Sequence, residues 1–393
     1  MERKTIEENK NGVRDYAVLV GLRSPVLGAD SADEECLAEL AALVETAGGE
    51  SVGMILQSRE KPDPHSFIGE GKVEEVKRMV ENSEATMVIF DNDLSPSQVR
   101  VLTELCGVQV LDRSGLILDI FAQRARTKEG CLQVELAQYQ YLLPRLIGMW
   151  SHLERQGGTG GSPIGTKGPG ETQLETDRRH IRRKIDKLKE ELEEVRRVRS
   201  TQRQRRMKNE IPVVAIVGYT NAGKSTLLNN LTRSEVLAEN KLFATLDPTT
   251  RRLRFPAERE IILADTVGFI RNLPKELMDA FRATLEELES ADLLVHVADA
   301  SHPDLLQQIT SVETILEELE LQHMPRILLL NKWDLLDVPA RAELADAFPH
   351  AIPVSARTGD GLKRLLEVLE NMLLSTQQSQ LLIPFEEDGA VIQ

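Results

Sequence analysis

The chain has 393 residues, a formal net charge of −15, and 41% hydrophobic and 28% charged residues. This length exceeds what one hydrophobic core usually supports, so we expect a protein of two or three domains. No apolar run reaches the roughly 18 to 20 residues that span a bilayer, and the first ten residues lack the apolar core of a signal peptide. We therefore expect a cytoplasmic chain without stable membrane insertion, and its acidity argues against a protein drawn uniformly to DNA or other nucleic acid.

The N-terminal part of the chain predicts a small α/β domain. Residues 1–14 are polar and predict a flexible N-terminus. Over residues 15–113, apolar runs typical of strands alternate with amphipathic stretches typical of helices, the first of them at 33–46. This alternation predicts a largely parallel sheet covered by helices. The isolated thiols Cys36, Cys106 and Cys131 lack metal-ligand spacing and are expected to be buried and reduced.

Residues 114–210 predict a helical hairpin with a glycine-rich loop at 157–170. That loop holds seven glycines and two prolines in fourteen residues, a composition that neither a helix nor a strand tolerates. The helix expected from about 174 to 206 has apolar residues that step by 4, 3, 4 and 3, namely Ile181, Ile185, Leu188, Leu192 and Val195. This heptad seam predicts antiparallel pairing with the helix before the loop.

The second helix of this hairpin is basic in an otherwise acidic chain. Between Asp177 and Lys208 there are 14 Lys and Arg against 6 Asp and Glu. Cationic side chains neutralise phosphates, and a glycine-rich tip lets backbone amides approach them closely. A solvated charged helix and a plain linker are the alternatives. We expect RNA contact, with these candidates: Gly160, Gly161, Lys167, Arg178, Arg179, Arg182 and Arg183.

A phosphate-binding loop organises the C-terminal half. The strand-like run at 213–217 leads into Gly218–Ser225, which fits G-x-x-x-x-G-K-[ST], and a helix begins at Lys224. Its amides and helix dipole suit an anion, Lys224 would bridge the terminal phosphates, and the Ser225 hydroxyl would bind Mg²⁺. The expected nucleotide-binding residues of this loop are Gly218, Tyr219, Thr220, Asn221, Ala222, Gly223, Lys224, Ser225 and Thr226.

Three further segments indicate which nucleotide binds. The strand at 260–265 ends in Asp265-Thr266-Val267-Gly268, where Asp265 can hold a magnesium-bound water and the Gly268 amide can bind the terminal phosphate. Later strands lead into Asn331-Lys332-Trp333-Asp334 and Ser355-Ala356-Arg357. The Asp334 carboxylate can accept from both the ring N–H and the exocyclic amine of guanine, a donor pair that adenine lacks. These elements follow the ends of strands, and they predict a doubly wound, mostly parallel GTPase domain at 211–376 and a short tail at 377–393.

This combination resembles the translation-factor-related GTPases. Gly168-Pro169-Gly170-Glu171-Thr172-Gln173-Leu174-Glu175, together with Phe243–Arg251, is similar to the HflX family. Members of that family are ribosome-associated GTPases that bind the large subunit and can separate stalled or idle ribosomes. The resemblance implies that Thr245 completes the magnesium shell and acts in catalysis, with Thr249 and Thr250 as weaker candidates from the sequence alone. It also adds nucleotide-binding candidates, which are Phe243, Ala244, Thr245, Leu246 and Asp247. The last residues, 381–393, look like the start of a small C-terminal domain that many relatives carry.

One departure concerns the residue after D-x-x-G, which is Phe269 here and a water-orienting glutamine in Ras-like enzymes. A phenylalanine cannot hydrogen-bond water, so intrinsic hydrolysis should be slow, and a partner can supply roughly 10³ to 10⁵ in rate. With Lys224, Thr245, Asp265 and Gly268 as catalytic candidates, we predict a monomeric, Mg²⁺-dependent GTPase. It would bind the large ribosomal subunit and its RNA and recycle ribosomes, with hydrolysis resetting the switch. The alternative is a GTP-regulated RNA-binding or remodelling factor with little turnover.

Overall fold

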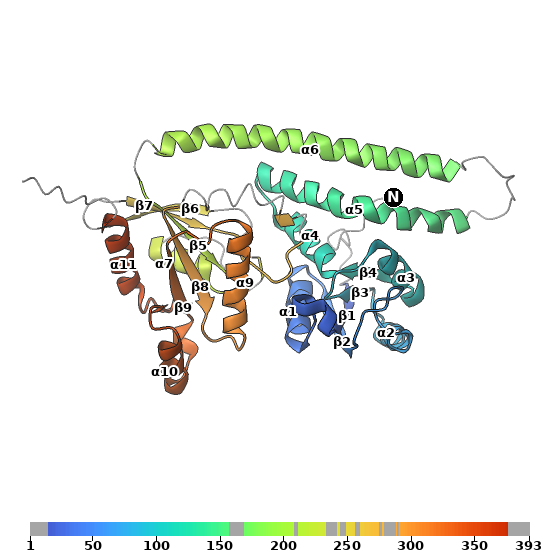
Figure 1. Ribbon diagram of the computed structural model, residues 1–393, viewed down its shortest axis with the longest axis horizontal. Coiled ribbons are helices and arrows are strands. Elements are labelled where there is room, and N and C mark those ends of the chain that lie inside the picture. The colour runs from blue at the N-terminus through green and yellow to red at the C-terminus, as the bar shows by residue number, and fades with distance from the viewer. Residues whose placement is uncertain are drawn as a thin grey trace, which may run out of the picture.

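Two α/β bodies and a helical hairpin make up the described part of the chain (Figure 1). The structure is a computed structural model and describes residues 15–156, 169–207, 211–232, 242–243, 249–255, 260–274, 277–278, 288 and 291–375. The two bodies lie side by side, and the hairpin runs along one side of them. Within these ranges, every helix is too short or too polar to cross a membrane.

The N-terminal body is a four-stranded sheet of order β2-β1-β3-β4 in which every pair is parallel. Its strands are β1 (Tyr16–Arg23), β2 (Glu50–Ser58), β3 (Met87–Phe90) and β4 (Gln109–Asp112). Its helices are η1 (Pro25–Asp30), α1 (Glu34–Thr46), α2 (Glu70–Ser83), α3 (Pro96–Cys106) and α4 (Arg113–Arg124). On β1, Leu19 packs with α1 and α4, while Val18 and Val20 pack with α2 and α3. Helices therefore cover both faces, as expected for a parallel sheet, and the predicted α/β fold is confirmed.

Helices of this body begin at side-chain caps. Asp33 accepts from the Cys36 amide at 2.8 Å, and Asp112 accepts from the Gly115 amide at 2.8 Å. Each cap satisfies an amide that has no partner inside its helix. Asp112 is the last residue of β4, so its cap fixes the point at which α4 leaves the carboxyl end of the sheet.

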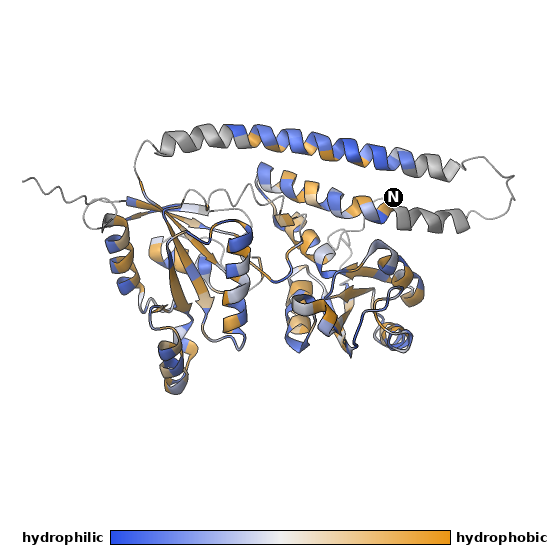
Figure 2. Cartoon of the chain, in the orientation of Figure 1, coloured by the Kyte–Doolittle hydropathy of each residue, from blue (hydrophilic) through white to orange (hydrophobic). Residues whose placement is uncertain are grey.

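The hairpin consists of α5 (Lys128–Gln156) and α6 (Pro169–Met207). Ile185, Leu188 and Leu192 of α6 are buried against Leu132 and Leu136 of α5, so the predicted heptad seam is confirmed. The remaining described surface of α6 is mostly hydrophilic (Figure 2). Residues 157–168, which hold most of the predicted glycine-rich loop, lie outside the described ranges.

The thiols agree only in part with the sequence-based expectation. Cys36 and Cys106 are buried in the N-terminal body, and burial raises the pKa of the Cys106 thiol to about 11. Cys131, near the start of α5, is exposed, so the expectation of a buried thiol was wrong there. The side of α5 that packs against α6 carries Leu132 and Leu136. The apolar neighbours of Cys131 in the sequence do not show that its own side chain lies off that side.

The C-terminal body is a six-stranded sheet of order β10-β9-β8-β5-β7-β6. Its strands are β5 (Val213–Gly218), β6 (Thr249–Arg254), β7 (Glu260–Asp265), β8 (Leu293–Asp299), β9 (Arg326–Asn331) and β10 (Ile352–Pro353). Its described helices include α7 (Lys224–Thr232), α9 (Leu305–Glu318), η2 (Trp333–Leu335), α10 (Val338–Ala347) and α11 (Leu362–Ser375). The β6–β7 pair is antiparallel and the other pairs are parallel. The predicted doubly wound, mostly parallel sheet is therefore confirmed.

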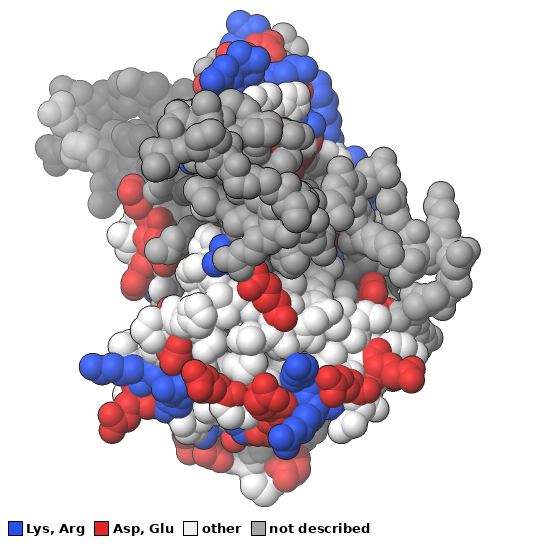
Figure 3. Space-filling view, turned by 90° about the vertical axis from the view of Figure 1, so that its right-hand side faces the viewer, with Lys and Arg blue, Asp and Glu red and all other residues white. Residues whose placement is uncertain are grey.

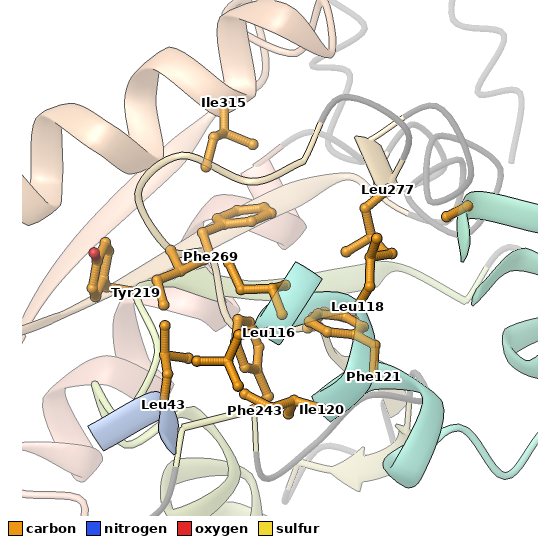
Figure 4. Packing of buried hydrophobic residues seen from close by; sticks show 14 of the residues in the cluster. Leu43, Leu116, Leu118, Ile120, Phe121, Tyr219, Phe243, Phe269, Leu277 and Ile315 are labelled. Atoms are coloured by element: carbon orange, nitrogen blue, oxygen red, sulfur yellow. The ribbon is translucent and has the colours of Figure 1, made fainter. Parts of the chain in front are cut away.

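One hydrophobic cluster joins the two bodies (Figure 4). Leu116 and Phe121 of α4 lie in the same cluster as Tyr219, Phe243 and Phe269 of the C-terminal body. The Phe121 and Phe243 rings are 4.6 Å apart at 62°, an edge-to-face contact. Such aromatic pairs add to the free energy gained from burial, so the bodies are packed together and are not merely tethered.

Candidate nucleotide-binding site

The phosphate loop depends on two glycines that no other residue could replace without strain. Gly218 has φ of 151°, and a Cβ there would lie 2.2 Å from the Val297 carbonyl oxygen. Gly223 has φ of 95°, and a Cβ there would lie 2.3 Å from Asn331 Nδ2. Both positions therefore require positive φ and close approach of a neighbouring chain segment. These restraints bend the chain between β5 and α7 into a turn that presents the start of α7.

Lys224, the first residue of α7, is buried beneath this loop. Its Nζ donates to the carbonyl oxygens of Gly218 and Tyr219 at 2.9 and 2.7 Å. Burial lowers the pKa of Lys224 to about 8, and the negative charge of Asp265 opposes that shift. A cation with two neutral acceptors is poorly compensated when buried, and an anion beside it would stabilise its charged form.

Ser225 and Asp265 bring two oxygen donors together at the other side of the loop. The Ser225 hydroxyl donates to Asp265 Oδ2 at 2.8 Å, and Asp265 is fully buried. Hard divalent cations prefer carboxylate and hydroxyl oxygens, so this pair fits a magnesium ion. Thr220 adds a buried hydroxyl with no partner among the described residues, which suits a loop that receives a polar ligand.

The D-x-x-G segment is hydrogen-bonded to the phosphate loop along its backbone. The Phe269 amide donates to the Gly218 carbonyl at 3.1 Å, and the Thr220 amide donates to the Phe269 carbonyl at 2.7 Å. Thr266 Oγ1 donates to the Ile216 carbonyl at 2.7 Å. Gly268 lies between these contacts, and a Cβ there would be 3.1 Å from Lys224 Nζ. Gly268 thus lies close to the Lys224 ammonium.

Phe269 itself is only 2% exposed and belongs to the cluster between the two bodies. Figure 4 shows its ring among the apolar side chains of that cluster. A buried apolar side chain in this position cannot hydrogen-bond a water molecule. The barrier to hydrolysis therefore has to be lowered by other groups.

The N-K-x-D segment connects three loops. Asn331 Nδ2 donates to the Ala222 carbonyl at 2.7 Å, and its Oδ1 accepts from the Ala356 amide at 2.8 Å. Lys332 has φ of 60°, and its Nζ donates to Asp299 Oδ2 at 2.6 Å. Residues 333 to 335 form η2, which leaves the Asp334 side chain partly exposed.

The structure brings together predicted residues from the phosphate loop, D-x-x-G and N-K-x-D, and from the Ser355–Arg357 turn. Ser355 and Ala356 are buried in that turn, and Arg357 is exposed. Thr226 continues α7 behind Ser225. Ala244, Thr245, Leu246 and Asp247 lie outside the described residues. Phe243 is described, and its carbonyl accepts from Arg124 of α4 at 2.9 Å.

The candidate RNA-contact residues fall into two groups. Arg179, Arg182 and Arg183 are exposed on α6, and Arg178 is partly exposed. Gly160, Gly161 and Lys167 lie outside the described residues. Figure 3 shows Lys and Arg gathered over the hairpin at the top, whereas the N-terminal body below carries both signs of charge.

Family models match along the chain. "GTP-binding GTPase N-terminal" matches residues 34–122, "GTP-binding GTPase Middle Region" matches 124–206, and "50S ribosome-binding GTPase" matches 213–332. The GTPase HflX of Caldanaerobacter subterraneus subsp. tengcongensis is 50% identical over 375 residues, which cover 95% of this chain and 84% of that protein. The chain belongs to the HflX family of GTPases. The predicted family and the prediction of a GTP-hydrolysing enzyme are both confirmed.

Other HflX relatives are nearly as similar. The GTPase HflX of Escherichia coli is 48% identical over 358 residues, which cover 90% of this chain and 83% of that protein. A solved structure of a GTP-binding protein from Sulfolobus solfataricus in complex with GDP is 26% identical, covers 92% of this chain and 99% of that chain, and has a TM-score of 0.45. The family assignment rests on the sequence relatives.

Sequence motifs missed three residues that support the nucleotide site of this HflX-family GTPase. Asp299 holds Lys332, and its position at the end of β8 was a signal that could have revealed it. Arg124 contacts the Phe243 carbonyl, and Glu39 of α1 accepts from the Tyr219 hydroxyl at 2.6 Å. No sequence pattern predicts the contacts of Arg124 and Glu39, because both residues lie in the N-terminal body.

Proposed function

We propose that this HflX-family GTPase binds the large ribosomal subunit and separates stalled or idle ribosomes, with GTP hydrolysis resetting the switch. The observation that carries the proposal is the row of exposed arginines on α6, which includes Arg179, Arg182 and Arg183. The family description "50S ribosome-binding GTPase" for residues 213–332 supports the choice of partner.

In the proposed reaction, the chain's own groups bind and orient the triphosphate. Lys224 pairs with the terminal phosphates and the Gly268 amide hydrogen-bonds the last one, since Gly268 lies close to the Lys224 ammonium. Asp334 selects guanine, and Asn331 holds its loop against the phosphate loop. Hydrolysis would then reset the segments around Thr245 and Gly268, because the terminal phosphate that they contact is lost.

Magnesium is the cofactor that the oxygen donors fit. Ser225 and Thr245 would bind it directly and Asp265 would bind through water, with Ser225 and Asp265 already 2.8 Å apart. Bound there, Mg²⁺ would neutralise charge on the phosphate oxygens.

Binding in the GTP state would supply the free energy for subunit separation, and hydrolysis would lower the affinity for release. A ligand shifts an equilibrium only by its differential affinity for the two states. Consequently, a non-hydrolysable GTP analogue should support separation as well as GTP does.

The first test measures phosphate release from GTP and from ATP, with and without purified large subunits, and follows intact ribosomes by sedimentation. We expect large subunits to raise GTP turnover several hundredfold, somewhat below the roughly 10³ to 10⁵ that supplied catalytic groups can provide, and Lys224→Ala to abolish it. An equal rise with ATP, or intact ribosomes that persist with the GTP analogue, would contradict the proposal.

A second candidate function is a GTP-regulated RNA-binding factor with little turnover, and the buried Phe269 ring favours it. No glutamine-like group faces the site from that position. This candidate predicts equal affinity for unrelated RNAs at one salt concentration and no stimulation by large subunits.

A further inference from the structure

Tyr219 occupies an unusual place in the phosphate loop, because its side chain reaches the other body. Its hydroxyl donates to Glu39 of α1 at 2.6 Å, across 180 residues of sequence. The same hydroxyl accepts from the backbone amide of Arg271 at 3.1 Å. A phenol has one proton and can also accept, so donation to Glu39 leaves a lone pair for the Arg271 amide. One oxygen atom thus joins the phosphate loop, the N-terminal body and the segment that follows D-x-x-G.

The backbone of Tyr219 contacts the same machinery. Its carbonyl accepts from Lys224 at 2.7 Å, and it forms a parallel bridge with Phe269. Gly268, whose amide would bind the terminal phosphate, is therefore flanked by two residues with fixed contacts, Phe269 in the bridge and Thr266 in its hydrogen bond to Ile216. Three residues further along the chain, the Arg271 amide is held by the Tyr219 hydroxyl. Movement of the Tyr219 ring would shift the Gly268 amide relative to Lys224.

Glu39 is itself held in place by buried charges. Its Oε2 accepts from Arg113 Nη2, and Arg113 Nη1 donates to Asp91 at 2.7 Å. Burial by itself lowers the pKa of Arg113, but the charges of Glu39 and Asp91 outweigh burial and raise it, so the guanidinium stays charged. Arg113 is 2% exposed and Asp91 is 3% exposed, and charge-assisted bonds are strong in such a site. The carboxylate thus offers the Tyr219 hydroxyl a fixed acceptor.

Burial of the phenol keeps that hydroxyl in its neutral, donating form. Desolvation, reinforced by the charge of Glu39, raises the pKa of Tyr219 far above its ordinary value. The hydroxyl can therefore donate throughout the physiological pH range.

We infer that Tyr219 is a positioning residue for GTP hydrolysis, held by Glu39 and Arg113 of the N-terminal body so that the Gly268 amide meets the terminal phosphate. The inference concerns GTP turnover itself and stands whether or not the ribosome is the partner. It makes the N-terminal body part of the nucleotide site, in addition to any role in binding RNA.

The proposed role affects GTP and GDP differently. GDP lacks the γ-phosphate, the terminal phosphate of GTP that the Gly268 amide would bind. The affinity for GDP therefore depends on the phosphate loop and not on the position of that amide. Removal of the Tyr219 hydroxyl should leave GDP affinity nearly unchanged. The same change should weaken a non-hydrolysable GTP analogue and lower kcat. A purely structural role of Tyr219 would instead weaken both nucleotides alike.

The test compares Tyr219→Phe, Glu39→Ala and the double variant in the full chain, without ribosomes. Each single variant should lower kcat about tenfold, the order expected for loss of one charge-assisted hydrogen bond, and keep GDP affinity within twofold of the wild type. The double variant should be no worse than either single variant, because both remove the same contact. Tyr16→Phe and Glu45→Ala, which remove a phenol hydroxyl and an α1 carboxylate elsewhere, are the matched controls.

Three results would overturn the inference. One is a kcat within twofold of the wild type for Tyr219→Phe. The second is a loss of GDP affinity equal to the loss of GTP-analogue affinity. The third is a double variant in which the two losses multiply. If Tyr219→Phe proves poorly folded, Glu39→Ala replaces it, since Glu39 lies outside the phosphate loop. A kcat within twofold of the wild type for Glu39→Ala, or equal losses of GDP and GTP-analogue affinity, would then overturn the inference.

Discussion

Asn331 Nδ2 donates to the carbonyl oxygen of Ala222 at 2.7 Å, although 109 residues separate the two. Its Oδ1 accepts from the Ala356 amide at 2.8 Å. The buried Asn331 amide thus fixes the phosphate loop relative to the N-K-x-D loop and the Ser355–Arg357 turn, which are proposed to surround guanine. The groups that would bind the base and the phosphates are therefore held in fixed positions relative to one another.

Replacing Asn331 by alanine should weaken GDP binding about 10- to 100-fold, because two buried groups lose their partners. A titration with a fluorescent GDP analogue measures the effect. Asn331→Asp keeps the acceptor for the Ala356 amide but loses the donor for Ala222, and should fall between alanine and the wild type. A GDP affinity within twofold of the wild type in Asn331→Ala would show that the loops align without this side chain.

Asp334→Asn should change the preferred base. An amide in place of the carboxylate can accept one hydrogen bond and donate another, so it no longer matches the two donors of guanine. It matches xanthine, which has a carbonyl where guanine has its exocyclic amine. We expect GTP affinity to fall at least tenfold and affinity for xanthosine triphosphate to rise, as competition binding would measure. Equal losses for both nucleotides would place Asp334 outside the base contact.

The free energy of unfolding should depend on pH because the pKa of the buried Lys224 is lowered. Its pKa is lowered by burial from 10.5 to about 8 in the folded protein. Between these two values the unfolded chain binds more protons, so the free energy of unfolding rises with pH in this window. Relative to Lys224→Met, the nucleotide-free wild type should gain up to about 3 kcal/mol as pH rises from 8 to 10.5. Denaturant unfolding of both proteins across this range measures the difference, and parallel curves would contradict the lowered pKa.

The exposed arginines of α6 should carry the salt dependence of RNA binding. Arg179 and Arg183 lie four residues apart, on one face of the helix, and both are exposed. Changing both to glutamine should weaken binding to large subunits and reduce the slope of log K against log salt by about one per lost phosphate contact. Lys363→Gln with Arg364→Gln on α11 removes the same charge elsewhere and should leave the slope unchanged. Equal slopes of log K against log salt in the two double variants would show that α6 does not make the RNA contact.

Several of these features could be predicted from the sequence because they are local. The turn of the phosphate loop follows from Gly218 and Gly223, and the hairpin seam follows from the spacing of Ile185, Leu188 and Leu192. The contact between Tyr219 and Glu39 could not be predicted, since it depends on how the two bodies pack against each other. Periodicity describes which face of an element is buried, but it does not identify the partner across 180 residues.

Phe269 provides the clearest case in which a motif and its surroundings have to be considered together. From the motif alone, glutamine at this position would restore an orienting group for water. The ring, however, is 2% exposed and packs between the bodies, so Phe269→Gln would bury an amide in an apolar cluster. We expect the free energy of unfolding to fall by about 2 to 4 kcal/mol with no gain in kcat. Phe269→Leu, which stays apolar, should lose less stability and retain the wild-type rate. A tenfold rise in turnover for the glutamine variant would contradict this expectation. It would mean that the glutamine side chain turns toward the nucleotide and that the packing between the two bodies rearranges to allow it.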